Sequence, residues 1–82
     1  MVTVKYTSLL RAGIGCESDR VQARTVAELM TLLEKRHGET FIGLKRLYRI
    51  FVNGASIQLG RGLETPLADG DEVVFLLPVA GG

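Results

Sequence analysis

The residues best suited to take part in a reaction lie at the end of the sequence, where Gly81 and Gly82 follow a short apolar run. Glycine has no Cβ, so its backbone can pass through spaces that reject other residues. A carboxylate on such a tail suits chemistry performed by a partner protein with a narrow channel. Residues 78–82 span roughly 16 Å when extended, enough to reach a buried active site. We therefore expect a flexible tail over residues 78–82, with Gly82 as the reactive group and Gly81 as its narrow neck.

Two other residues of reactive type have simpler structural interpretations. Cys16 follows Gly13-Ile14-Gly15, and no basic residue stands directly beside it to lower the pKa of its thiol. We interpret Cys16 as a small residue that fills a loop. His37 falls at the end of the expected helix, where a positive charge suits the helix dipole, so capping and packing explain it better than catalysis.

Clusters of charged residues also have structural interpretations. Acidic residues around Gly70 have the spacing of a tight turn between two strands, which explains them better than a metal site does. Basic residues near the middle of the chain lack an aromatic stacking platform, so they indicate a solvated surface. These two sets are Asp69, Asp71 and Glu72, and Lys35, Arg36, Lys45, Arg46 and Arg49. The pattern offers no Ser/His/Asp set and no metal-ligand cluster, and it predicts no bound metal or cofactor.

Composition predicts one small domain over residues 1–82, since the chain has 82 residues of which 46% are hydrophobic. A net charge of +1 argues against a nucleic-acid-binding protein. The single cysteine excludes an internal disulfide and favours a reducing, cytoplasmic location. The N-terminus lacks a signal-peptide pattern, and the longest apolar run, 73–80, is too short for a membrane helix.

The first half of the chain predicts a hairpin followed by a helix. Apolar residues alternate over 2–6, which is typical of a half-buried strand, and a weaker alternation over 19–24 predicts its partner. Residues 12–15 have turn chemistry. Thr25 and Glu28 fit a capping box at the start of the helix. An apolar stripe then leads through Leu29 and Leu33 to His37, and Gly38 predicts the stop.

The second half predicts three strands. Residues 39–46 form a loop or short helical turn, and 48–52 have the aromatic and β-branched content of a strand. Asn53-Gly54 is a strong hairpin signal, with a short strand over 56–59. Residues 60–67 are irregular, 69–71 form a turn, and 72–77 form the last strand. We expect this strand to lie beside the first, in an α+β mixed sheet with one main helix on one face.

Three segments resemble the MoaD/ThiS family of sulfur carriers, which share the ubiquitin-like β-grasp fold. These are RIFVNG at 49–54, TPLADGDEV at 65–73 and PVAGG at 78–82. The resemblance covers the whole chain, because strand order, central helix and terminus all agree with it. The length and the final five residues are more similar to the small subunit of molybdopterin synthase than to the shorter thiamine carriers.

The resemblance implies a cycle carried out on Gly82. An E1-like adenylyltransferase of the MoeB/ThiF type would use ATP to adenylate the carboxylate, and sulfur would then replace one oxygen. The resulting thiocarboxylate would enter a client enzyme, here the MoaE-type large subunit of molybdopterin synthase, for molybdenum or tungsten cofactor synthesis. The carrier would bind no cofactor itself and would need neither nucleic acid nor membrane. Tethering sulfur to a protein raises its effective concentration over free sulfide.

The residues before the tail are candidates for partner binding: Phe75, Leu77, Pro78, Val79 and Ala80. Phe75, Leu77 and Val79 share one side of the strand until Pro78 disturbs the register. Phe75 and Leu77 can belong to the core or to an apolar docking patch on the open face of the sheet, and both alternatives remain open. Val74 and Leu76 point to the opposite face, so some apolar exposure is expected across the segment.

Other functions are compatible with the same pattern. The client can instead belong to thiamine, cysteine or tRNA-thiolation pathways. An activated Gly82 can also form isopeptide bonds with lysines, as a ubiquitin-like modifier does. A plain interaction module with an unused tail is a fourth alternative, and deletion of Gly81-Gly82 would separate it from the other three.

Overall fold

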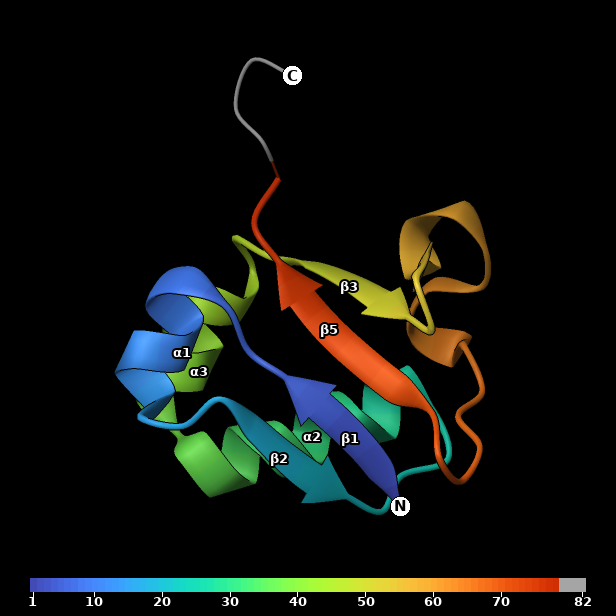
Figure 1. The fold of residues 1–82 in the computed structure, drawn as a ribbon, viewed down its shortest axis with the longest axis horizontal. Helices are drawn as coiled ribbons and strands as arrows, with labels where there is room; N and C mark the ends of the chain where they lie inside the picture. The colour runs from blue at the N-terminus through green and yellow to red at the C-terminus, as the bar shows by residue number, and fades with distance from the viewer. Residues whose placement is uncertain (79–82) are drawn as a thin grey trace.

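Residues 1–78 are described by the computed structural model of the chain, and they form a five-stranded mixed sheet with helices on one face (Figure 1). The strand order is β2-β1-β5-β3-β4. This is the predicted α+β arrangement of the ubiquitin-like β-grasp fold. Within the described residues, no helix is long and apolar enough to cross a membrane.

The first hairpin forms as predicted but contains an additional helix. Strand β1 (Val2–Lys5) pairs antiparallel with β2 (Ser18–Val21), which is shorter than the predicted 19–24. It ends at Val21 because the following chain crosses to the segment 65–67, where the backbone N–H of Leu67 donates to the Arg24 carbonyl at 2.8 Å. Between the strands, residues expected to form a turn belong to helix α1 (Ser8–Ile14).

The turn predicted at residues 12–15 is wrong, because Gly13 lies inside helix α1 and Gly15 ends it. Gly15 is the C-cap, with φ 86°, and its N–H donates to the Arg11 carbonyl at 2.9 Å. Glycine is favoured in this left-handed conformation because it has no Cβ. The glycine that suggested a turn in the sequence therefore marks the end of a helix. Leu10 is the one residue of α1 that is fully buried, so the helical periodicity of this segment is weak.

The central helix α2 (Val26–His37) begins and ends where the capping pattern predicts. Thr25 Oγ1 accepts a hydrogen bond from the Glu28 N–H at 3.1 Å, and Glu28 Oε1 accepts one from the backbone N–H of Arg24 at 3.2 Å. Gly38 ends the helix with φ 65°. The next segment, for which the sequence allows a loop or a short helical turn, is the helix α3 (Glu39–Lys45), with Phe41 fully buried.

The last three strands carry the chain to the tail. Strand β3 (Arg49–Val52) turns at Asn53-Gly54 into β4, which covers only Ala55–Ser56 instead of 56–59. The 3₁₀ helices η1 (Ile57–Leu59) and η2 (Gly62–Glu64) follow. Strand β5 (Glu72–Leu76) then enters the centre of the sheet, parallel to β1 and antiparallel to β3. The predicted pairing of the first and last strands is confirmed.

The core lies between the sheet and the three helices. Each strand contributes its alternate residues to it, so that Val4, Val73 and Phe75 are completely buried against Leu29 and Leu33 of α2. Within residues 1–78, no helix covers the other face of β1, β3 and β5. It carries the intervening, partly or wholly exposed side chains of these strands, and it faces the viewer in Figure 1.

Candidate functional site

The chain leaves the sheet at the end of β5, beside the open face. Leu77 and Pro78 follow the strand and are exposed. The Thr7 hydroxyl donates a hydrogen bond to the Phe75 carbonyl at 2.7 Å, which fixes the strand close to its last residue. Val79, Ala80, Gly81 and Gly82, which the sequence assigns to partner binding and to the reactive tail, lie outside the described residues.

Phe75 is part of the core and cannot serve as a docking residue. Its side chain is fully buried, and its ring lies 5.6 Å from that of Phe41 in an edge-to-face arrangement. The ring of Tyr6 lies 6.0 Å from it on another side. Of the two alternatives left open by the sequence, the structure therefore selects the core for Phe75. Leu77 differs, since 37% of its surface is exposed after the strand has ended.

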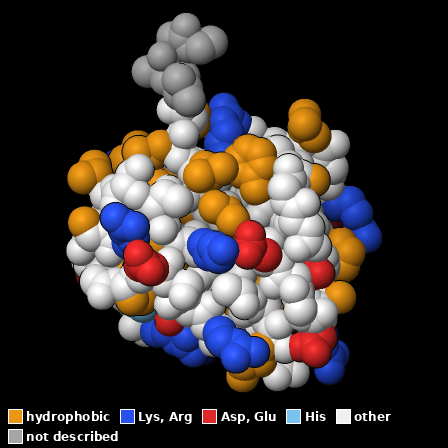
Figure 2. Space-filling model, in the orientation of Figure 1, with side chains coloured by type: hydrophobic (Ala, Val, Ile, Leu, Met, Phe, Trp, Pro, Cys, Tyr) orange, Lys and Arg blue, Asp and Glu red, His pale blue; other side chains and the backbone are white. Residues whose placement is uncertain are grey.

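Exposed leucines are found on three segments that meet near the end of β5. We call Leu9, Leu47, Leu76 and Leu77 the exit patch; their exposed fractions are 63%, 50%, 40% and 37%. Hydrogen bonds hold these segments together, because the Tyr48 hydroxyl accepts from the Leu10 N–H at 2.8 Å and donates to the Thr7 carbonyl at 3.2 Å. Leu76 also pairs with Arg49 of β3. Figure 2 shows apolar side chains gathered below the grey atoms on this face.

The exit patch continues along the open face. Phe51 of β3 and Val74 of β5 pair across the strands and are half-buried, which extends the apolar surface. Lys5 and Glu72 form an ion pair at 3.1 Å farther along the same face. The exposure of Leu76 confirms the predicted apolar exposure on the face of β5 opposite to Phe75. Leu9 and Leu47 were missed, since only the tertiary fold brings α1 and the turn before β3 to the end of β5.

The acidic residues near Gly70 lie at a turn, as predicted, with Glu72 already the first residue of β5. Each has a different partner: Asp69 pairs with the N-terminal amino group, Asp71 Oδ2 accepts from the Ala68 N–H at 2.8 Å, and Glu72 pairs with Lys5. The bond from the Ala68 N–H and a second from the Asn53 side chain lower the pKa of Asp71.

The basic residues do not form a single patch. Arg49 lies on the open face of β3, where its guanidinium donates to Gln58, whereas Lys35 and Arg36 lie at the end of α2 on the other side of the sheet. Lys45 pairs with Glu34. Arg46 is exposed in the turn that follows α3. These positions agree with the solvated surface predicted from the sequence.

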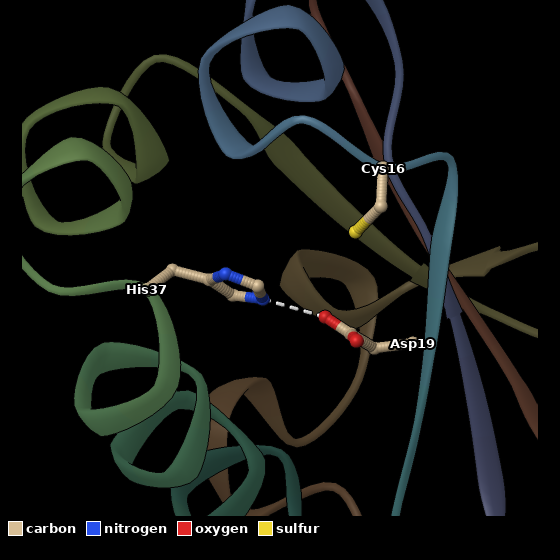
Figure 3. A group of neighbouring side chains, drawn as sticks. All are labelled: Cys16, Asp19 and His37. Carbon is tan, nitrogen blue, oxygen red and sulfur yellow. Dashed lines mark hydrogen bonds and ion pairs between the residues drawn. The ribbon is translucent and has the colours of Figure 1, made fainter.

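Cys16, Asp19 and His37 converge at the end of α2, although the sequence predicts no metal-ligand cluster (Figure 3). Their sulfur, oxygen and nitrogen ligand atoms all lie within 4.8 Å of one another. The His37 Nε2 and Asp19 Oδ2 atoms are 2.5 Å apart, and the Tyr6 hydroxyl donates to the same oxygen at 2.7 Å. The expected packing role of His37 is also present, since its ring meets that of Tyr6 edge-on at 5.8 Å.

Burial and hydrogen bonding shift the pKa values in this cluster. Burial acts to raise the pKa of Asp19, but hydrogen bonds from Tyr6 and His37 and the charges of His37 and Arg36 outweigh it, so the pKa is lowered. Burial and the nearby Asp19 charge raise the pKa of the Cys16 thiol. Burial, the hydrogen bond to Asp19 and the negative charge of Asp19 together raise the pKa of the Tyr6 hydroxyl. Cys16 is therefore a thiol and not an activated nucleophile.

The strand order and the helices packed on one face define the class of this protein, the ubiquitin-like β-grasp fold. A family model described as the ThiS family matches residues 4–82. A putative sulfur carrier protein of Archaeoglobus fulgidus is 46% identical over 48 residues, 58% of this chain and 50% of that protein. The chain therefore spans about half the length of this curated relative. Because the family model covers almost the whole chain, the chain belongs to the ThiS family.

Solved structures of three kinds are similar over nearly the whole chain. A chain in the Amycolatopsis orientalis BexX/CysO complex is 31% identical with a TM-score of 0.84, covering 100% of both chains. Small archaeal modifier protein 1 of Methanosarcina acetivorans is 28% identical with a TM-score of 0.80, covering 99% of this chain and 95% of that one. A chain in the complex of subunits 1 and 2 of the Helicobacter pylori molybdopterin-converting factor is 30% identical, with a TM-score of 0.74 and coverages of 99% and 97%.

Proposed function

We propose that the chain carries sulfur as a thiocarboxylate on Gly82 and acts, in the cytoplasm, as the small subunit of molybdopterin synthase. The family match that extends to residue 82 supports the first part. Similarity to a subunit of the Helicobacter pylori molybdopterin-converting factor supports the second. The single observation that carries the proposal is the exit patch, an apolar surface that lies directly before the tail and adjoins the sheet face left open by the described helices.

The proposed activation requires a partner, because a carboxylate is a poor electrophile. An E1-like adenylyltransferase would let a carboxylate oxygen of Gly82 attack the α-phosphorus of ATP, with pyrophosphate leaving. A hydrosulfide-equivalent nucleophile would then attack the acyl carbon, AMP would leave, and a proton would be released. The product is a thiocarboxylate in which sulfur has replaced one oxygen. The carrier contributes no general acid or base to either step in this scheme, and Gly81 is the neck that enters the partner.

The exit patch would dock the activating enzyme and the large subunit in turn. Exposed apolar residues just before residues 79–82 would give a partner a surface to bury while it receives the tail. Lys5 and Glu72 lie at the rim of this surface, where paired charges fix orientation more than affinity. Leu77 and Pro78 remain candidates for this contact, together with Leu76, whereas Phe75 is excluded by its burial.

Intact-mass analysis tests the carrier chemistry. The chain is incubated with an E1-like enzyme, ATP and a sulfur donor, and we expect a mass gain equal to sulfur minus oxygen. Methionine oxidation adds the same nominal mass, so fragment ions must place the gain on Gly82. A chain lacking Gly81-Gly82 is the control and must show no gain. Complete absence of the thiocarboxylate under conditions that charge a known carrier would contradict the proposal.

Binding measurements test the docking surface separately. Leu76→Ser and Leu77→Ser are expected to weaken binding to the large subunit, and the double variant should weaken it most. Leu59→Ser is the matched control, because Leu59 is 90% exposed but lies in η1, away from the exit patch. Equal loss of binding in Leu59→Ser and the exit-patch variants would remove the exit patch from the proposed interface.

A second candidate keeps the thiocarboxylate or its adenylate but changes the recipient. The higher TM-scores of the CysO chain and of the archaeal modifier favour it. In that case sulfur goes to a different client, such as a cysteine or thiamine pathway or tRNA thiolation, or Gly82 is joined to lysine side chains. Pull-down of the client distinguishes the sulfur routes. Tryptic peptides with a Gly-Gly branch on lysine would instead identify a modifier.

A further inference from the structure

Three side chains with metal-ligand atoms converge on one point that the proposed carrier function does not use. Cys16 comes from the loop after α1, Asp19 from β2, and His37 from the last turn of α2. In Figure 3 the sulfur of Cys16 points toward the region where the His37 imidazole meets the Asp19 carboxylate. All three ligand atoms lie within 4.8 Å of one another, on segments that the core holds together.

The donor set indicates which cation would fit. Sulfur, imidazole nitrogen and carboxylate oxygen together are the ligands that Zn²⁺ prefers, whereas Mg²⁺ and Ca²⁺ prefer oxygen alone. A thiolate and a carboxylate also balance a charge of +2. Tetrahedral zinc with bonds of 2.0–2.3 Å places its ligand atoms on the order of 3.3–3.6 Å apart. To reach this spacing, His37 Nε2 and Asp19 Oδ2, now 2.5 Å apart, would have to separate, and Cys16 Sγ would have to take its place from within 4.8 Å of both.

We propose that Cys16, Asp19 and His37 form a binding site for a divalent transition-metal cation of the zinc type, with water as the fourth ligand. Metal binding forms bonds to Cys16 Sγ, Asp19 and His37 Nε2. The thiol proton is released to solvent. His37 Nε2 also gives up the proton that it donates to Asp19, to solvent from an imidazolium or to Nδ1 by a change of tautomer, so that neutral His37 carries its one proton on Nδ1. The hydrogen bond between His37 Nε2 and Asp19 Oδ2 is exchanged for two bonds to the metal.

Neighbouring side chains supply the outer shell that such sites need. The Tyr6 hydroxyl donates to Asp19 Oδ2 at 2.7 Å, and Arg36 Nη1 lies 3.3 Å from Oδ1, so the carboxylate is held from two directions. The Asp19 and His37 side chains are only 16% and 13% exposed, which limits competition from water. Arg36 is the one cation beside the site among the described residues, and its side chain is 46% exposed and screened by solvent.

Cobalt is a suitable probe, because Co²⁺ replaces zinc and has a visible spectrum. The chain is purified without a histidine tag, with Gly82 as a carboxylate, so that no thiocarboxylate sulfur competes. Titration is expected to give a saturable one-to-one complex with the d–d bands of a tetrahedral site and a thiolate-to-cobalt charge-transfer band. Zn²⁺ should displace Co²⁺ and raise the melting temperature, since a ligand that binds only the folded state stabilises it.

Variants assign the ligands. Cys16→Ser should remove the charge-transfer band. Tyr6→Phe, which removes a hydrogen bond to Asp19, should lower the affinity for cobalt roughly 10- to 100-fold. Asp19→Asn and His37→Gln, which change ligands, should lower it further. Glu17→Gln is the matched control beside Cys16 and should bind normally, because Glu17 is exposed and pairs with Arg11. Amide NMR spectra of each variant verify that it is folded before titration.

Two results would overturn the proposal. One is the absence of saturable cobalt binding by the folded wild-type chain. The other is a complex without a charge-transfer band, or with a band that survives in folded Cys16→Ser. The assay requires no sulfur transfer, so neither result affects the proposed carrier function, and a failed carrier assay leaves the metal site standing.

Discussion

Phe75 and Leu77 stand two residues apart and have opposite environments. Alternation along a strand places both on the same side, and on that side Phe75 fills the core between Tyr6 and Phe41. The strand ends at Leu76, so the constraint of the sheet no longer determines the direction of Leu77. Two residues of similar chemical type therefore have different roles, one in stability and the other beside the exit.

The first prediction separates these roles. Phe75→Ala should reduce the free energy of unfolding by about 3–5 kcal/mol, because it leaves a cavity in the core. Leu77→Ala should change it by about 0.5 kcal/mol or less, as expected for an exposed residue. Urea unfolding followed by circular dichroism measures both. A loss for Leu77→Ala as large as that for Phe75→Ala would contradict the assignment.

Asp71 gives a prediction for pH dependence. Its pKa is lowered by hydrogen bonds from the Ala68 N–H and the Asn53 side chain, both of which favour the ionised carboxylate. The stabilisation is therefore fully present above the ordinary Asp pKa of about 3.9 and is lost as pH falls through the lower folded value. Carboxyl NMR titration should show the lowered pKa, and Asp71→Asn should flatten this part of the stability profile. A folded pKa at or above the ordinary value would refute it.

At the level of elements, α1 is positioned by its contact with α3. A Cβ at Gly13 would lie 2.8 Å from Thr40 Cγ2 and 3.2 Å from Leu44 Cδ1, closer than normal van der Waals contact. The absence of a side chain at Gly13 therefore lets the two helices approach each other. Leu9 of the exit patch lies on the same helix α1, so this packing fixes the element that carries it.

A matched pair of glycine substitutions tests this contact. Gly43→Ala in α3 meets nothing within 4 Å and should stabilise the chain by roughly 0.5–1 kcal/mol through helix propensity. Gly13→Ala gains the same propensity but forces Thr40 and Leu44 to move, so it should be less stable than Gly43→Ala by about 1 kcal/mol or more. Thermal unfolding compares the two. Equal stabilisation by both substitutions would mean that the helices do not pack closely at Gly13.

Elements with a complete local pattern could be predicted from the sequence. Elements with a weak apolar pattern, and contacts between residues far apart in the sequence, could not. Strand β1, helix α2 and the Asn53-Gly54 turn each have a complete local signal. Helix α1 has a single fully buried residue and a glycine inside it, so its pattern is indistinguishable from a loop. The apolar stripe of α2 placed His37 toward the sheet. Its meeting with Asp19, 18 residues away, depends on how α2 packs against β2.

At the scale of the whole molecule, folding and transfer chemistry should be separable. Residues 1–78 contain the five-stranded sheet and the core packed against it, whereas the proposed reactive group lies beyond them. Deletion of Gly81-Gly82 should leave the melting temperature within about 2 °C of the wild type, while abolishing charging by the E1-like enzyme. Differential scanning calorimetry and intact mass give the two readouts. Charging that survives the deletion would contradict the role of Gly82.

The parallel pairing of β1 with β5 has a mechanical consequence. The chain enters the sheet at the start of β1 and leaves at the end of β5, at opposite ends of two neighbouring strands (Figure 1). A force that pulled the two ends of the polypeptide apart would load the rungs between these strands in shear. The rungs would then have to rupture together and not one after another, so a machine that tugs on the tail would meet high resistance.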